Sequence, residues 1–372
     1  MMIRWFFRAT FLTFLLPCTS MWTTSANHTI VFLSNTNNAT TFRLKGINWF
    51  GYEGGCNIVG GLQYHDMDFY LDQLQELQYN ALRIPFGYET VLNWEQPPLS
   101  SCLSPPNEAL FGNMSVRDTM HVLFQKAADR HMVILLDFHT IAYEVTQYPW
   151  TGDITRDLIM DTWKQVIWEF SPYENLLGVD VKNEPHGNIT WDVWGAFLLT
   201  FVDTVTRECP HFNGLIFVGG IQESLSVWGG GFTSMGRTLN PILPRPSLVF
   251  SPHIYGYSIR GQVALEDTYM LLDHWFGFLL RRFPNPVVVG EIGGWAVNQD
   301  RQWHTLLQHY LVRRNITDVF YWCLNPDSHD TGGLLLDDWT TMDAFKVAFH
   351  RRIQPRPTTD LVFAAPASAP PS

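Results

Sequence analysis

Eight short runs of β-forming residues alternate with helical patterns along most of this chain, and this alternation restricts the possible folds more than any other feature. The runs cover residues 42–49, 80–86, 132–139, 176–184, 214–220, 247–255, 286–291 and 317–325. Helical patterns lie near residues 67–79, 116–130, 155–170, 191–208, 262–282, 300–314 and 340–351. Strands that alternate with helices indicate a parallel sheet. Eight such units predict an α/β fold, the (β/α)8 TIM barrel.

The main alternative fold is an open, doubly wound parallel sheet. Its Gly-x-Gly-x-x-Gly phosphate fingerprint does not occur at the first strand–helix turn, which favours the barrel. Residues 221–246 are rich in Gly and Pro, and we expect a long loop there with at most a short helix. Residues 29–43 predict a small β-hairpin that closes the bottom of the barrel.

The N-terminus has the pattern of a secretory signal peptide. Arg4 and Arg8 are followed by a short apolar run at 11–16 and by small residues that suit cleavage after Ser20 or, alternatively, after Ala26. The apolar run is shorter than the roughly 20 residues that span a bilayer, so we expect no stable membrane insertion. The predicted division is a signal peptide at 1–20, a catalytic domain at 27–353 and a disordered Pro/Ala/Ser-rich tail at 354–372.

Sequons and cysteines agree with a secreted, extracellular glycoprotein. Five Asn-x-Ser/Thr sequons are candidate glycosylation sites: Asn27, Asn38, Asn113, Asn188 and Asn315. Cys18 leaves with the signal peptide, and Cys56 and Cys102 flank the same early loops, so we expect them to form a disulfide. The pairing of Cys209 and Cys323 stays open, and no cysteine spacing resembles a zinc site.

Composition limits the partners. The formal net charge is −11 and no long Lys/Arg run occurs, which argues against nucleic acid as a partner. The chain is 46% hydrophobic and 16% charged, enough for one large core, and we expect a monomer. Its 15 Trp residues are of the kind that flat, wet binding surfaces use.

Polar residues end six of the predicted strands, at the place where a TIM barrel has its active site. They are Arg83, Asp137, His139, Asn183, Glu184, His253, Tyr255, Glu291, Trp322 and Asn325. Each has a structural explanation when taken singly, for example a satisfied core histidine or a capping aspartate. Because isolated buried polar groups are costly, their gathering at one barrel mouth favours a shared pocket.

Two of these residues are carboxylates on opposite sides of the predicted mouth. Glu184 ends the fourth strand and Glu291 ends the seventh. A pair of carboxyl groups that flank the scissile bond is the apparatus of glycoside hydrolysis. One carboxyl must be protonated and the other ionised, so their environments must separate the two pKa values.

Seven motifs in this order resemble glycoside hydrolase family five, the retaining cellulase family, and in particular its bacterial-type endo-β-1,4-glucanases. The resemblance covers residues 42–350 and includes "LRIPF" at 82–86, "VKNEPHG" at 181–187 and "VVVGEIGGW" at 287–295. The other four motifs are "GINWFGYE" at 46–53, "LLDFH" at 135–139, "SPHIYG" at 251–256 and "WCLNPDSHDTGGLLLDDW" at 322–339.

The resemblance implies a role for each strand-end residue. Glu184 would be the acid/base and Glu291 the nucleophile, while Asn183 would bind the sugar 2-hydroxyl. The supporting residues would be Arg83 and Tyr255, which orient Glu291, together with His139, His253 and the sugar platform Trp322. Weaker candidates for substrate binding are Trp49, Trp228 and Asp327. No metal and no organic cofactor is implied.

Two departures from the family pattern occur: the first is a change in packing, and the second concerns the substrate. Ile292 follows the nucleophile where Phe is usual, and the loop after His139 lacks the polar character of the bacterial relatives. A polysaccharide or oligosaccharide of β-1,4-glucan is the expected substrate, with β-mannan, β-1,3-glucan or a glycolipid as alternatives. A non-catalytic glycan-binding barrel and a metal-dependent hydrolase are the alternatives of other classes.

Overall fold

The structure is a computed structural model of the 372-residue chain. It describes residues 20–36, 38–143, 145, 148–223, 228–243, 245–260 and 265–364. The predicted signal peptide, apart from Ser20, and residues 365–372 of the predicted tail lie outside the described residues. Among the residues described, no helix combines the length and the apolar character needed to cross a membrane.

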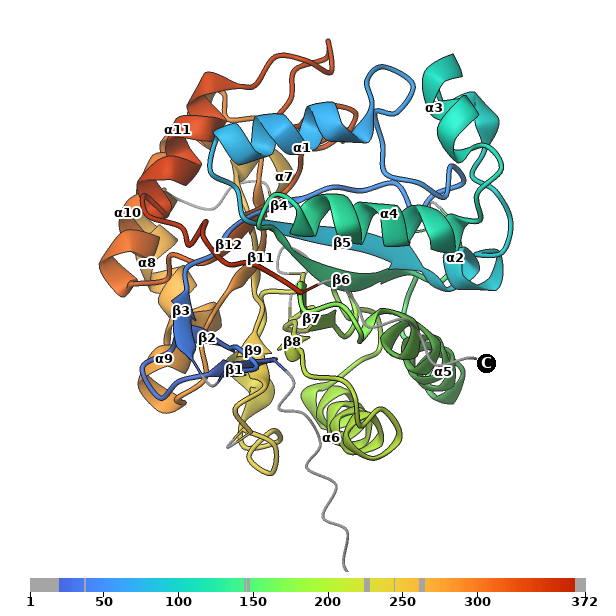
Figure 1. Ribbon diagram of the computed structural model, residues 1–372. Coiled ribbons are helices and arrows are strands. Elements are labelled where there is room, and N and C mark those ends of the chain that lie inside the picture. The colour runs from blue at the N-terminus through green and yellow to red at the C-terminus, as the bar shows by residue number, and fades with distance from the viewer. Residues whose placement is uncertain are drawn as a thin grey trace, which may run out of the picture.

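A curled parallel sheet forms the centre of the molecule and confirms the predicted barrel (Figure 1). Its order is β10-β11-β12-β4-β5-β6-β7-β8-β9. The strands are β4 (Lys45–Asn48), β5 (Ala81–Gly87), β6 (Val133–Thr140), β7 (Leu176–Asp180), β8 (Leu215–Val218), β9 (Leu248–Phe250), β10 (His253–Tyr255), β11 (Val289–Gly293) and β12 (Val319–Tyr321).

The sixth predicted strand, residues 247–255, is divided into β9 and β10 around Ser251 and Pro252. Proline has no N–H to give to a strand ladder, so pairing is interrupted there. The two strands lie at opposite ends of the sheet order, and Phe250 also bridges Val287, just before β11. The sheet therefore closes on itself.

Helices surround the sheet (Figure 1). Those that match the predicted helical patterns are α1 (Met67–Glu76), α4 (Val116–Ala128), α5 (Asp153–Phe170), α6 (Trp191–Glu208), α10 (Asn298–Arg314) and α11 (Ala344–Ile353). Local sequence sets several of their starts: Asp66, Ser115 and Thr190 are N-caps whose side chains accept backbone N–H bonds of the first turn.

The helix predicted over 262–282 is not continuous. The described part contains the 3-10 turn η3 (Leu265–Asp267), α8 (Thr268–Leu272), the π-helical turn η4 (Asp273–Gly277) and α9 (Leu279–Arg282). Unpredicted short helices are α2 (Tyr88–Leu92), η1 (Ser100–Cys102), α3 (Pro105–Phe111) and α7 (Tyr257–Arg260). The long loop at 221–246 contains only the 3-10 turn η2 (Thr233–Met235) in its described part, as expected.

Strand alternation explains why polar residues collect inside one end of the barrel. Ala81 and Leu135 belong to an apolar cluster in the lower barrel. Because side chains at i and i+2 share a face of a strand, Arg83 lies above Ala81, and Asp137 and His139 lie above Leu135. The lower interior is thus apolar and the upper interior polar.

A three-stranded antiparallel sheet belongs to the same lower cluster. Its strands are β1 (Met21–Thr24), β2 (Ile30–Leu33) and β3 (Ala39–Phe42), in the order β1-β2-β3. The hairpin predicted at 29–43 is confirmed, and β1 is an addition to it. Trp22 of β1 is buried against Phe32 and Phe42, with ring centroids 4.8 and 5.1 Å away. Cleavage after residue 26 would remove β1 altogether.

The prediction of a disordered tail from residue 354 is wrong for residues 354–364. Gln354 is buried, and its amide donates to Thr317 and Asp318 at 3.2 Å. Leu361 and Phe363 pack in the lower apolar cluster. Thr358 also donates from its backbone N–H to the Arg43 carbonyl at 3.0 Å and accepts from Asn80 at 2.7 Å. The folded unit therefore extends beyond the predicted limits of 27 and 353.

The predicted disulfide is confirmed. Cys56 and Cys102 are bonded, with Cα atoms 5.9 Å apart, and they join the segments that follow β4 and β5. Cys209 and Cys323 are both free and buried. The bridge restrains two loops on the side of the barrel that carries the polar residues.

We predict that Trp22→Ala lowers the free energy of unfolding by about 3–5 kcal/mol, because it opens a cavity in the lower cluster. Urea unfolding followed by circular dichroism measures this change. Trp168→Ala is a matched control, since Trp168 on α5 is 59% exposed, and its effect should stay within about 0.5 kcal/mol. Equal effects of the two changes would contradict the role given to β1.

Candidate active site

A buried arginine organises the polar end of the barrel. Arg83 on β5 is fully buried, and its guanidinium contacts Glu291 Oε1 at 2.7 Å, Asp137 Oδ1 at 2.9 Å and Asp180 Oδ2 at 3.1 Å. It also donates to the side-chain oxygens of Asn48 and Asn183. Burial acts to lower the pKa of Arg83, but the three carboxylates outweigh it and raise this pKa above its ordinary value. The group is a permanent cation.

Glu291 on β11 is held from two sides and is buried. Arg83 donates to Oε1, while the Tyr255 hydroxyl donates to Oε2. Burial, followed by the charge of Glu291, raises the pKa of Tyr255 well above its ordinary value, so the hydroxyl keeps its proton. Glu291 therefore has a cation at one carboxylate oxygen and a neutral hydroxyl donor at the other.

Glu184 faces the same space from the loop after β7. Its carboxylate is 16% exposed, and Oε1 lies 3.1 Å from Nδ1 of His253, which is itself 3.4 Å from Glu291 Oε2. One carboxylate oxygen of Glu184 and one of Glu291 lie within 4.8 Å of each other. Retaining glycosidases separate their two carboxyl groups by roughly 5 Å, and inverting enzymes separate them further.

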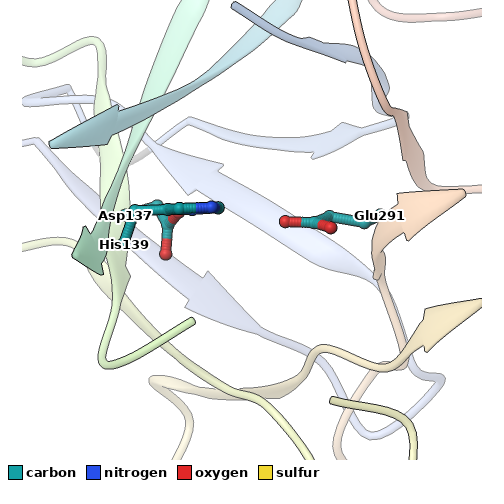
Figure 2. Close-up of side chains that lie close together, drawn as sticks. All are labelled: Asp137, His139 and Glu291. Carbon is teal, nitrogen blue, oxygen red and sulfur yellow. The ribbon is translucent and has the colours of Figure 1, made fainter. Parts of the chain in front are cut away.

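His139 completes the opposite wall. Its Nδ1 lies 2.6 Å from Asp137 Oδ2 and its Nε2 lies 3.4 Å from Asn183 Nδ2. Figure 2 shows the imidazole of His139 and the carboxylate of Glu291 pointing toward each other from opposite sides of the barrel. Burial acts to lower the pKa of His139, but Asp137 outweighs it and raises this pKa.

Two groups of side chains have the spacing of metal ligands: Asp137, His139 and Glu291, and Glu184, His253 and Glu291. Arg83 already contacts both Asp137 and Glu291, at 2.9 and 2.7 Å. A divalent ion bound to either carboxylate would lie close to this permanent cation and be repelled by it. The charges therefore fit an ion-paired carboxylate better than a metal centre.

Aromatic rings flank the carboxylates on both sides. The half-buried ring of Trp322 stacks on His139 and on Phe50, with centroids 5.4 and 5.8 Å away. On the other side, Trp228 stacks on His186 at 4.5 Å and is also half-buried. Both indoles are firmly packed and partly open, which suits contact with the apolar face of a sugar ring.

Trp49 does not belong to the site, contrary to the expectation for substrate binding. It is fully buried, packs against Tyr70, and donates from Nε1 to the Gly60 carbonyl at 3.0 Å. A side chain with no exposed surface cannot contact a substrate. Asp327 is exposed in the loop after β12, and no bond described for this part of the chain joins it to the central group.

The sequence reasoning missed Asp180 and Lys182 as members of the site. Burial raises the pKa of Asp180 to about 6, although the ion pair with Arg83 acts to lower this pKa. Lys182 is buried and donates from Nζ to the His139 carbonyl at 3.1 Å and to the Asn183 carbonyl at 2.6 Å. The signal was available: two charged residues interrupt an apolar strand immediately before the Asn-Glu-Pro motif.

All five sequon asparagines are exposed: Asn27, Asn38, Asn113, Asn188 and Asn315. Their exposure is compatible with glycosylation. Asn188 is closest in sequence to Glu184 and lies three residues before α6 begins at Trp191.

Comparison with known proteins places the chain in a family. The sequence model of Cellulase (glycosyl hydrolase family 5) matches residues 35–328. The chain belongs to this family, and it is a glycoside hydrolase. An endoglucanase from Paenibacillus polymyxa is 29% identical over 357 residues, covering 87% of this chain and 86% of the relative. The major extracellular endoglucanase of Xanthomonas campestris is 29% identical over 333 residues, covering 84% of this chain and 67% of that protein.

Comparison with solved structures also finds cellulases. The endocellulase of Pyrococcus horikoshii superposes with a TM-score of 0.81 at 27% identity, over 91% of this chain and 99% of the other. The catalytic domain of the Xanthomonas campestris enzyme gives a TM-score of 0.79 at 26% identity, over 90% and 100% of the two chains. Resemblance to a family 5 retaining glycosidase, expected from the motifs, is thus confirmed.

Replacement of Arg83 tests how the site is held. We predict that Arg83→Met lowers the free energy of unfolding at pH 7 by about 3–5 kcal/mol, because three buried carboxylates lose their cation. Asp137 has a pKa that Arg83 lowers, so its stabilisation is present at neutral pH and is lost as pH falls through that pKa. The difference between the two proteins should therefore shrink in acid.

Urea unfolding at neutral and acidic pH measures this dependence. The control is Arg117→Met, which breaks a partly exposed pair with Glu95 and should cost about 0–1 kcal/mol. A loss from Arg83→Met that does not change with pH would contradict the electrostatic explanation.

Proposed function

We propose that this chain is a secreted, retaining endo-β-1,4-glucanase that cleaves internal glucosidic bonds of cellulose or a related β-glucan. The observation that carries the proposal is the pair Glu184 and Glu291, which approach within 4.8 Å through one carboxylate oxygen each. This separation suits direct attack by a carboxylate and leaves too little room for the intervening water of an inverting enzyme.

The first step forms a covalent intermediate. Glu291, ionised beside Arg83, attacks the anomeric carbon, and the bond from that carbon to the glycosidic oxygen breaks. Glu184 transfers its proton to the departing oxygen, so the shortened chain leaves as an alcohol. The products of this step are a glycosyl ester on Glu291 and an ionised Glu184.

The second step releases the sugar. Glu184, now a base, takes a proton from a water molecule that attacks the anomeric carbon, and the bond to Glu291 breaks. Both carboxyl groups return to their starting states, and two inversions give net retention. His253, at 3.1 and 3.4 Å from the two carboxylates, is placed to contact both throughout.

Asn183 is oriented for the sugar 2-hydroxyl by the same arginine. Its side-chain oxygen accepts from Arg83 at 3.1 Å, which fixes the amide so that Nδ2 is the atom presented as donor. A hydrogen bond to the 2-hydroxyl strengthens as charge develops on the ring, so it contributes mainly to the transition state. Trp322 would support the same sugar from below with its indole face.

The relatives support glucan as the substrate. Two of them are named endoglucanases, and a structure of the Pyrococcus horikoshii endocellulase is a complex with cellotetraose. A β-mannanase from Streptomyces thermolilacinus shares only the fold, at 13% identity and a TM-score of 0.60. β-Mannan, β-1,3-glucan and glycolipid remain the alternatives with the same chemistry.

Secretion and glycosylation are supported by the N-terminal pattern, the exposed sequons and the disulfide between Cys56 and Cys102. Disulfides persist in oxidising compartments and are rare in the cytosol. A non-catalytic glycan-binding barrel is disfavoured, because both carboxylates and their supporting side chains are in place.

The deciding experiment compares reducing-end release from carboxymethyl cellulose, galactomannan and laminarin. Rapid release from the cellulose derivative with a fast drop in viscosity is expected. Release from galactomannan or laminarin alone would keep the mechanism and overturn the substrate.

We predict that Glu291→Gln lowers kcat on the preferred polymer by several orders of magnitude, because the amide cannot form the glycosyl intermediate. Glu95→Gln, at a side chain that is 59% exposed, is the matched control and should leave kcat unchanged. Steady-state kinetics with confirmed folding of both variants measures the contrast. Near-native turnover by Glu291→Gln would show that another group is the nucleophile.

A further inference from the structure

The backbone of Glu184 has an unfavourable conformation. Its φ is +42°, in the left-handed region that residues with a Cβ rarely adopt, because the Cβ is crowded there. Pro185 follows, and the residue before a proline normally has an extended backbone. Two local preferences of the chain therefore oppose this conformation, so the surrounding structure must hold it.

Glu184 lies at a bend of the chain. The backbone N–H of Asn183 still donates to the Phe138 carbonyl of β6, at 2.9 Å, so the chain follows its neighbouring strand up to this residue. The Pro185 carbonyl accepts instead from the backbone N–H of Gln222, also at 2.9 Å. The change of direction falls on Glu184, between two stretches that are bonded to different parts of the barrel.

Side chains hold the two peptide groups that flank the Cα of Glu184. Lys182 Nζ donates to the Asn183 carbonyl at 2.6 Å, and His186 Nδ1 donates to the Glu184 carbonyl at 2.6 Å. A carbonyl cannot donate, so Nδ1 must carry the proton of this bond. The torsions φ and ψ of Glu184 rotate these two peptide groups about its Cα, and the two bonds therefore restrain both torsions.

Both donor side chains are buried, with Lys182 2% exposed and His186 6% exposed. Lys182 Nζ also donates to the His139 carbonyl at 3.1 Å, which ties it to β6. The imidazole of His186 stacks on Trp228 at 4.5 Å, and its Nε2 has no hydrogen bond within the described part of the chain. The bond to the Glu184 carbonyl is thus the one polar contact described for this ring.

The side chain of Glu184 has little freedom of its own. Its Oε1 lies 3.1 Å from Nδ1 of His253, and a Cβ added to Gly229 would come within 3.1 Å of its Cγ. The side chain starts at the Cα, so a rotation of the backbone at Glu184 would carry the carboxyl group away from His253. The direction of the carboxyl group therefore depends on the backbone torsions that the two bonds restrain.

We propose that Lys182 and His186 are positioning residues that hold Glu184 in its left-handed conformation and thereby aim its carboxyl group at the departing oxygen. The inference rests on the proposed function, in which Glu184 is the acid. Neither side chain takes part in the proton transfer itself. Their loss should therefore slow the steps that need the proton of Glu184 and spare those that do not.

Two aryl glycosides separate these steps. Phenolate is a poor leaving group that needs a proton from Glu184, whereas 2,4-dinitrophenolate leaves without one. For both β-cellobiosides, kcat/KM includes only the steps up to formation of the glycosyl ester on Glu291. Glu184→Ala is the reference variant and should lose activity mainly on the phenyl substrate. Damage to the fold alone would lower kcat/KM equally on both substrates.

A matched pair at residue 186 isolates the bond to the Glu184 carbonyl. Asn carries an N–H donor close to the position of His Nδ1, whereas Leu has none, and both lack the imidazole that stacks on Trp228. His186→Leu should lower kcat/KM on phenyl β-cellobioside at least about tenfold, and on the dinitrophenyl substrate less than about twofold. His186→Asn should recover most of the loss.

Lys182→Met should show the same dependence on the leaving group as His186→Leu. Lys164→Met on α5 and His309→Leu on α10 make the same replacements at side chains that are partly exposed and exposed. These two controls should leave kcat/KM unchanged on both substrates.

The second step of the reaction gives an independent measurement. With the dinitrophenyl substrate, His186→Leu should lower kcat, because the attacking water must lose a proton to Glu184. Azide attacks the anomeric carbon without losing a proton and breaks the bond to Glu291, which yields a glycosyl azide. Added azide should therefore restore kcat in His186→Leu and leave that of the wild-type enzyme unchanged.

Equal losses on the two aryl glycosides in His186→Leu, or an Asn variant as impaired as the Leu variant, would overturn the inference and leave the proposed function standing. Equal losses in Glu184→Ala would instead overturn Glu184 as the acid and with it the proposed function. A wild-type enzyme that acts on galactomannan and on neither β-cellobioside would overturn the glucan substrate, and the same comparison then uses the two aryl β-mannobiosides.

Discussion

The site depends on one buried cation. Arg83 is fully enclosed in the barrel, where an unpaired charge would be very costly, and it is surrounded by the carboxylates of Asp137, Asp180 and Glu291. Each carboxylate comes from a different strand. The ion pairs therefore fix β5, β6, β7 and β11 relative to one another at the end of the barrel that carries Glu184 and Glu291.

This arrangement separates the two glutamates chemically. Glu291 accepts from a cation on one oxygen and from a phenol hydroxyl on the other. Glu184 is more open and contacts His253 instead. Two identical side chains thus lie in different environments, one inside the ion-pair network and the other at its edge, as the proposed double displacement requires.

The interior of the lower half of the barrel is apolar, and the charged groups lie above it. The apolar cluster that contains Leu135, Val249 and Phe320 fills the interior below the arginine, and Trp22 and Leu361 extend it beyond the strands. Segments from both ends of the described chain thereby cover the bottom of the barrel.

Most strands and helices of the barrel could be predicted from local patterns. The signals were hydrophobic periodicity and N-cap residues such as Ser115. Where prediction failed, a distant contact decided the outcome. Composition suggested disorder after residue 354, but Leu361 and Phe363 meet an apolar cluster that no local signal reveals. Trp49 lies in a family motif, yet its side chain turns into the core behind the mouth.

The sequence by itself determined the order of strands and helices, and it singled out Glu184 and Glu291 as the carboxylates that end two of the strands. It also determined the alternation that puts Arg83, Asp137 and His139 inside the barrel. These follow from side-chain period and from motifs, which are local properties. Only the tertiary structure decided the approach of both glutamates to His253, the left-handed backbone of Glu184 and the bonds of Lys182 and His186. Such quantities depend on how separate strands meet when the barrel closes, and residues distant in sequence set them jointly.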